Sequence, residues 1–126
     1  MRGERARARL LRPFPVVRIR GWLTERGAMV RLLTVRTPRG VRVAVRCRGD
    51  GCPRGAWARE AGRARLTRLR PFEGFLRAGV ELRIRVTRPG WIGKHTTIQI
   101  RRGRPPARTD RCLYPGRSKP ARCVRP

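Results

Sequence analysis

The chain has 126 residues, with 34 basic and 7 acidic side chains, and its formal net charge at pH 7 is +27. This length fits one domain, and the ordered alternation of valine, isoleucine and leucine excludes a disordered chain. No stretch approaches the ~18 apolar residues that a membrane span needs, and the basic N-terminal region contains no apolar signal segment.

The first third of the chain predicts a loose segment followed by two strands. Residues 1–13 are basic and interrupted by proline, so we expect them to be flexible. Apolar and basic residues then alternate, which places successive side chains on opposite faces of a strand at 16–23. After a turn at 24–27 we expect a second strand at 28–36, where a slip in the alternation near Leu32–Leu33 indicates a bulge or two buried faces.

The same alternation continues after a turn at 37–40, and it predicts further strands at 41–47, 64–69, 80–86 and 96–101. Residues 53–63 are rich in proline, glycine and alanine and predict a loop, with a short helical turn around Trp57. The connection at 70–79 carries three large apolar side chains. The residues expected to plug one end of the core are therefore Phe72, Phe75 and Leu76.

Short strands with frequent turns and no helical period predict an all-β fold. We expect a small Ig-like antiparallel β-sandwich of six to seven strands over residues 14–103. A purely parallel sheet is not expected, because it would need helical crossovers and no helical period is present. A small closed barrel is the alternative. Residues 104–126 are rich in proline, glycine and arginine, and they predict an irregular tail closed by a disulfide.

Four cysteines allow three disulfide connectivities. The pairs that are local in sequence, Cys47 with Cys52 and Cys112 with Cys123, are the simplest. A four-cysteine zinc site is the alternative, but the C-x4-C and C-x10-C spacings differ from the usual zinc knuckles, and no C-x-x-C redox motif is present. We expect disulfides. They persist in oxidising compartments and indicate an extracellular or cell-envelope location. Because the chain as given contains no signal segment, we expect it to be a fragment of an exported protein, or to begin at a wrongly chosen start.

The inventory of reactive side chains is poor. Ser118 is the only serine, His95 is the only histidine, and asparagine is absent. The glycine spacing at 89–97 does not match a phosphate-binding P-loop, so we expect 87–95 to be a loop in which Lys94 and His95 are solvated. We expect no enzymatic activity, no metal site and no cofactor.

The positive charge has two interpretations. Of the 34 basic residues, 32 are arginine, which is typical of a coding bias in a GC-rich genome and of a solvated basic surface. The shortage of acidic residues instead favours an anionic partner: an anionic polymer or surface, or nucleic acid bound without sequence specificity. The outward-facing residues that we predict for polyanion contact are Arg18, Arg20, Arg42, Arg46, Arg83, Arg85 and Arg101.

Four sequence elements together carry a resemblance: "VRTPRG", "CRGDGCP", "RVTRPGWIGK" and "DRCLYPG…C". Across about residues 14 to 123, the chain resembles an uncharacterised arginine-rich domain that recurs in predicted exported proteins of high-GC bacteria. The resemblance implies an extracytoplasmic β domain with both cysteine pairs in place, and it implies no activity.

From the sequence we expect a non-catalytic structural or binding module of an exported or cell-envelope protein. Its ligand is not specified by the sequence, and other domains of a longer parent protein are candidate partners. The alternative is a non-specific polyanion-binding protein that acts on nucleic acid or on an anionic wall polymer.

Overall fold

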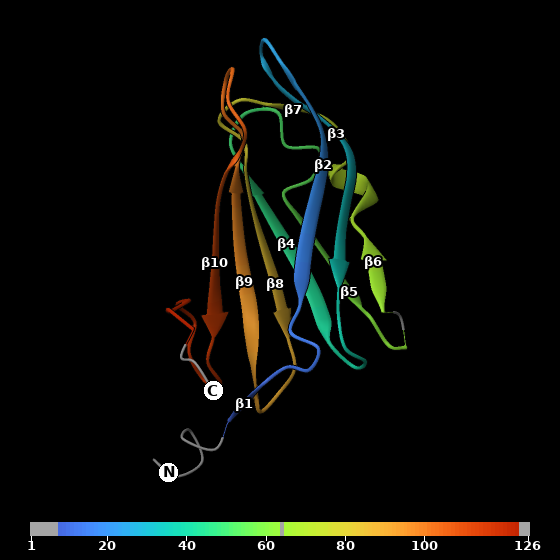
Figure 1. Cartoon of the computed structure of the whole chain (residues 1–126), viewed down its shortest axis with the longest axis vertical. Helices are drawn as coiled ribbons and strands as arrows, with labels where there is room; N and C mark the ends of the chain where they lie inside the picture. The colour runs from blue at the N-terminus through green and yellow to red at the C-terminus, as the bar shows by residue number, and fades with distance from the viewer. Residues whose placement is uncertain (1–7, 64, 124–126) are drawn as a thin grey trace.

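The computed structural model describes residues 8–63 and 65–123, which form a sandwich of two β-sheets around one core (Figure 1). The predicted all-β sandwich is confirmed. Within these residues the strand pairing is antiparallel, except for a short parallel pair between β1 and β9. The predicted flexible segment 1–13 lies mostly outside the described residues, but its last part is ordered. Arg9 and Leu10 form β1, and Leu11 is buried.

The first sheet contains β1 (Arg9–Leu10), β4 (Arg42–Arg48), β5 (Ala56–Glu60), β8 (Glu81–Thr87), β9 (Trp91–Gln99) and β10 (Ala107–Leu113). Its order is β5–β4–β8–β9, and β1 and β10 pair with successive parts of the free edge of β9. The second sheet contains β2 (Val16–Thr24), β3 (Gly27–Arg36), β6 (Leu66–Arg68) and β7 (Gly74–Arg77). In it, β3 pairs with β2 on one side and with β6 and β7 on the other.

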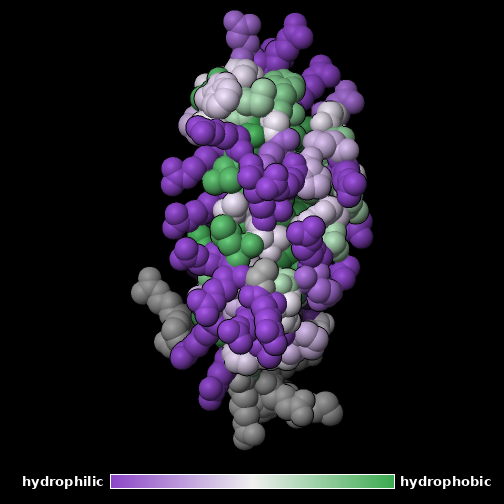
Figure 2. All heavy atoms as spheres, turned by 90° about the vertical axis from the view of Figure 1, so that its right-hand side faces the viewer, coloured by the Kyte–Doolittle hydropathy of each residue, from purple (hydrophilic) through white to green (hydrophobic). Residues whose placement is uncertain are grey.

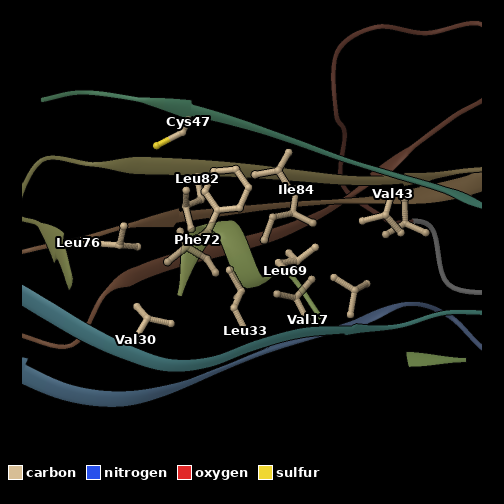
Figure 3. Packing of buried hydrophobic residues seen from close by; sticks show 14 of the residues in the cluster. Val17, Val30, Leu33, Val43, Cys47, Leu69, Phe72, Leu76, Leu82 and Ile84 are labelled. Carbon is tan, nitrogen blue, oxygen red and sulfur yellow. The ribbon is translucent and has the colours of Figure 1, made fainter. Parts of the chain in front are cut away.

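The core lies between the two sheets and follows the alternation of the central strands. Val45 of β4 pairs with Ile84 of β8, and both side chains are buried. Leu33 of β3 faces them from the second sheet. Figure 3 shows Ile84 and Leu33 on opposite sides of the interior, with Phe72 near the middle of the cluster. Alternate residues of these strands therefore fill the interior, and their arginines are left outside.

The predicted bulge is present, close to the expected position. The β2–β3 register shifts at Arg20 and Gly21, which pair with Leu32 and Val30, so Arg31 is the extra residue. A Cβ atom at Gly21 would collide with the carbonyl oxygen of Met29, so this close approach requires glycine. Across the bulge the alternation of β3 changes phase, from buried Leu33 and Val35 to buried Ala28 and Val30. Strand β2 keeps its alternation, so Trp22 faces outward like Arg20.

Besides β1, three strands lie where irregular structure was predicted. The predicted connection at 70–79 contains β7. The predicted loop at 53–63 contains strand β5, not a helical turn at Trp57, and the predicted tail from 104 contains β10. Strands β5 and β10 lie at a sheet edge, and most of their side chains are exposed, so an apolar alternation is missing from their sequences. The sandwich thus extends beyond the predicted boundary at Gly103.

Strand β9 begins earlier than predicted. It includes Lys94 and His95, which were expected in a solvated loop. His95 is buried, and the Lys94 side chain is only 11% exposed. The error arises because this part of β9 buries polar side chains, which removes the hydrophobic signal of a strand.

The connection between β6 and β7 closes one part of the core. It contains a short 3-10 helix, η1 (Arg70–Phe72), and Phe72 and Leu76 are fully buried as predicted. Phe75 is 45% exposed on the outer face, so its predicted role as a plug is wrong. In the gap between β6 and β7, the backbone N–H of Leu33 donates to the Glu73 carboxylate at 2.9 Å.

Both local disulfides are present, which excludes the four-cysteine zinc alternative. Cys47 is bonded to Cys52 and Cys112 to Cys123, with Cα–Cα distances of 5.8 and 5.0 Å. The first bridge requires the chain to double back within six residues. Gly49 and Gly51 allow this turn, because both adopt positive φ angles of 104° and 98° that residues with a Cβ atom rarely tolerate.

Candidate anion-binding surface

Most of the positive charge has no acidic partner. The described residues contain ion pairs between Arg42 and Glu60, Arg68 and Glu73, Arg77 and Asp50, Arg83 and Glu81, and from Lys94 and Arg108 to Asp110. The other described basic side chains form no ion pair within this part of the chain. Figure 2, a view from the side of β3 and β6, shows hydrophilic side chains along the full length of the molecule.

The seven predicted arginines do not form one site. Arg18 and Arg20 lie on the outer face of the second sheet, because they are exposed and alternate with Val17 and Ile19, which pack in or against the core. The other sheet places Arg42, Arg46, Arg83 and Arg85 on the opposite outer face, and Arg101 follows β9. The structure therefore presents two basic faces with a core between them.

Several of these arginines already have partners. Arg42 pairs with Glu60 at 3.1 Å, and Arg83 pairs with Glu81 at 2.7 Å. Arg85 donates to the carbonyl oxygen of Ser118, and Arg101 donates twice to that of Pro105. Three of the seven arginines have guanidinium groups with neither an ion pair nor a hydrogen bond within the described residues. They are Arg18, Arg20 and Arg46. These three are the most available for an external anion.

No pattern in the sequence indicated a second basic feature, a hollow at one end of the second sheet. Arginines from three separate segments surround it, and its volume is about 580 Å³. These residues are Arg12, Arg36, Arg39 and Arg65. They lie up to 53 positions apart in the chain, so no local pattern predicts that they meet. We refer to this feature as the arginine hollow.

The outer face of the second sheet also carries an apolar row. Trp22 pairs with Met29, and Met29 pairs with Phe75, so the three side chains lie side by side across β2, β3 and β7. Trp22 is 58% exposed. A smaller apolar hollow of about 260 Å³ lies near the same hairpin, where residues of β2 and β3 face Pro105 and Pro106. These features offer contact area but no reactive group.

A polar cluster closes the edge of the sandwich between β9 and β10. Asp110 accepts hydrogen bonds from Thr96 at 2.8 Å and from Arg108 at 2.8 and 3.1 Å, and Lys94 lies 3.3 Å away. Lys94 also donates to the carbonyl oxygen of Pro15 at 2.9 Å. Partial burial alone would raise the pKa of Asp110, but the hydrogen bonds and the neighbouring cations lower it to about 2. Charged side chains at this edge also oppose pairing with another chain.

Replacing Asp110 with asparagine is expected to lower the free energy of unfolding at pH 7 by about 1 kcal/mol, because the carboxylate is more than a third exposed and solvent screens it. A carboxylate with a lowered pKa stabilises the fold above its unfolded pKa, and this contribution is lost as the pH falls through the folded value. Urea unfolding of the native chain should therefore show a decline between about pH 4 and pH 2 that is smaller in the variant.

The matched control is Asp50→Asn. The Asp50 side chain is 95% exposed, and its ion pair with Arg77 is long, at 3.7 Å. This variant should leave the free energy of unfolding and its pH dependence almost unchanged. Equal effects of the two substitutions would show that net charge, and not the β9–β10 cluster, determines the acid sensitivity.

The side chains that could support catalysis lie in unfavourable places. Burial lowers the pKa of His95, and the nearby Arg85 and Arg83 lower it further, so the imidazole is neutral at pH 7. Ser118 is exposed in the segment after β10. In the part of the chain that the structure describes, no three His, Cys, Asp or Glu side chains are grouped as metal ligands would be.

Across residues 8–63 and 65–123, no helix has the length and apolar character needed to cross a bilayer. The fold and the surface together define a class of protein: a small β-sandwich with two disulfides and two strongly basic outer faces. No protein-family model, no curated protein sequence and no solved structure matches this chain.

Proposed function

We propose that this chain is a non-catalytic binding module of an exported or cell-envelope protein, and that its partner is an anionic polymer or surface. The observation that carries the proposal is the excess of exposed arginine without acidic partners on both outer faces of the sandwich. A net charge of +27 repels itself, and bound anions relieve that repulsion. Nucleic acid belongs to the same class of partner, bound through phosphates without sequence readout.

The two disulfides support the location, since such bridges persist in oxidising compartments. The burial of the single histidine supports a non-catalytic role. The Ig-like assignment and the resemblance to the arginine-rich domain of exported proteins belong to the same proposal, and both rest on the sequence.

The test measures binding of the folded chain to duplex DNA and to heparin over a range of salt concentrations. We expect a dissociation constant of about 1–100 μM at physiological salt and a linear fall of log affinity with log salt. Replacing Arg18, Arg20 and Arg46 by glutamine should weaken binding about tenfold and reduce the salt slope, because the proposed contacts are lost.

A control variant removes the same charge elsewhere. Replacing Arg102, Arg104 and Arg117, which are exposed in loops, should weaken binding less than threefold. If both triple variants lose the same affinity, the arginines act only through net charge. Absence of measurable binding at physiological salt would exclude the proposed partner class and favour a purely structural module.

A further inference from the structure

We propose that the arginine hollow is a binding pocket for phosphate groups, and that it fixes the end of a phosphate-bearing polymer on the second sheet. This inference rests on the proposed function and specifies the chemical class of the ligand. It concerns one pocket with defined walls and not the diffuse charge of the two outer faces.

Three segments build the hollow. The arm between β1 and β2 contributes Arg12 and Pro13, the end of β3 and the following turn contribute Arg36 to Arg39, and the approach to β6 contributes Arg65 and Leu66. The backbone N–H of Thr37 donates to the carbonyl oxygen of Arg65 at 2.9 Å, which joins two of these walls. Thr37 and Pro38, which also line the hollow, are buried, so part of its lining is held within the fold.

Within the described residues, nothing compensates the charge of the hollow. None of the described residues that line it is acidic, and its four arginines form no ion pair with any of them. All four are exposed, and their guanidinium groups are thus accessible to a ligand. At physiological salt, screening acts over about 8 Å, so cations gathered around one hollow still repel one another. A bound anion is the simplest way to relieve this repulsion.

Phosphate suits the hollow better than a carboxylate does. A guanidinium group presents a planar fork of donors that binds phosphate through two parallel hydrogen bonds. A phosphate group has enough oxygen atoms to accept hydrogen bonds from more than one such fork, whereas a carboxylate has only two oxygen atoms. A hollow of about 580 Å³ lies within the range of small-molecule sites, so it has room for a phosphate group with its attached alcohol or sugar. Leu66, 58% exposed, offers an apolar wall to that part.

The hollow also continues into the basic face described above. Arg36 pairs with Val16 in the β2–β3 register, and Arg18, two residues further along β2, lies on the same outer face. Diagonal neighbours of this kind are about 7–8 Å apart in a sheet. A polymer with one phosphate in the hollow therefore meets Arg18 next and Arg20 beyond it.

The test compares two double variants that carry the same net charge. Arg36→Gln with Arg39→Gln removes two arginines of the hollow. The control variant, Arg26→Gln with Arg54→Gln, removes two exposed arginines near the ends of β3 and β4 that lie away from the hollow. Binding to inorganic pyrophosphate, a short poly(glycerol phosphate), a single-stranded oligonucleotide and polyglutamate is measured by calorimetry at 150 mM salt.

We expect the hollow variant to lose about tenfold or more in affinity for the phosphate probes, and the control variant to lose less than threefold. The poly(glycerol phosphate) and oligonucleotide measurements then distinguish a wall polymer from nucleic acid. As a second readout, pyrophosphate should shift the amide NMR signals of Thr37 and Leu66 in the unmodified chain. Circular dichroism confirms that each variant is folded.

Equal losses in the two double variants, or pyrophosphate shifts spread evenly over the surface, would overturn the pocket. Equal losses on polyglutamate and on the phosphate probes would overturn the phosphate class. Neither result affects the proposed polyanion-binding module, which is tested separately by the triple variant of Arg18, Arg20 and Arg46. Conversely, failure of that triple variant leaves the pyrophosphate measurement able to support the hollow.

Discussion

Replacing Phe72 with alanine is expected to lower the free energy of unfolding by about 3–5 kcal/mol, the range for deletion of a buried aromatic ring. Phe72 is fully buried, and Figure 3 shows its ring beside Leu82, with side chains from both sheets around it. The substitution leaves a cavity that the flanking strands cannot close. Since domains of this size are stable by about 5–15 kcal/mol, urea unfolding should show a large fall in the midpoint.

Phe75 provides the matched control, because it is the same residue type three positions away. Its ring is 45% exposed on the outer face of β7, beside Met29. Phe75→Ala should therefore change the free energy of unfolding by less than about 1 kcal/mol. Similar losses in the two variants would mean that the core does not lie between the sheets as described. A larger loss for Phe75 would mean that the outer face is covered in solution.

The strands that sequence patterns predicted are those with one buried face. In β4 and β8, valine, leucine and isoleucine alternate with arginine because one face meets the core and the other meets solvent. Strands β5 and β10 were missed because they lie at sheet edges with most side chains exposed. The start of β9 was missed for the opposite reason: His95 is a buried polar residue, and the Lys94 side chain is only 11% exposed.

The candidate site was likewise predicted only where local alternation determines which way a side chain faces. Alternation predicted that Arg18 and Arg46 face away from the core, and the registers place them on outer faces. The arginine hollow could not be predicted, because it requires the pairing of β3 with β6 and the path of the N-terminal arm. Both are long-range features. Between Arg39 and Arg65 the sequence has no periodicity that indicates their meeting.

Removing the Cys112–Cys123 bridge, by alanine at both positions, is expected to lower the free energy of unfolding by about 3 kcal/mol. A disulfide limits the unfolded chain, and the effect grows with the length of the closed loop. Here the sequence separation is 11 residues. The side chains of residues 114–123 are all exposed or half-buried, so little packing replaces the bridge. Urea unfolding measures the loss, and hydrogen exchange should become fast at Ala121, whose backbone pairs with Cys112.

The Cys47–Cys52 pair serves as the comparison, because its separation is only 5 residues. Alanine at these two positions should cost about 2 kcal/mol by the same loop argument, without faster exchange at Ala121. If neither double variant is destabilised, packing alone holds the sandwich together, and the case for an oxidising compartment is lost. If both behave as expected, the chain combines self-repelling surface charge with covalent links that need an oxidising environment. Both features would then agree with the proposed function, a basic module outside the reducing cytoplasm with an anionic partner.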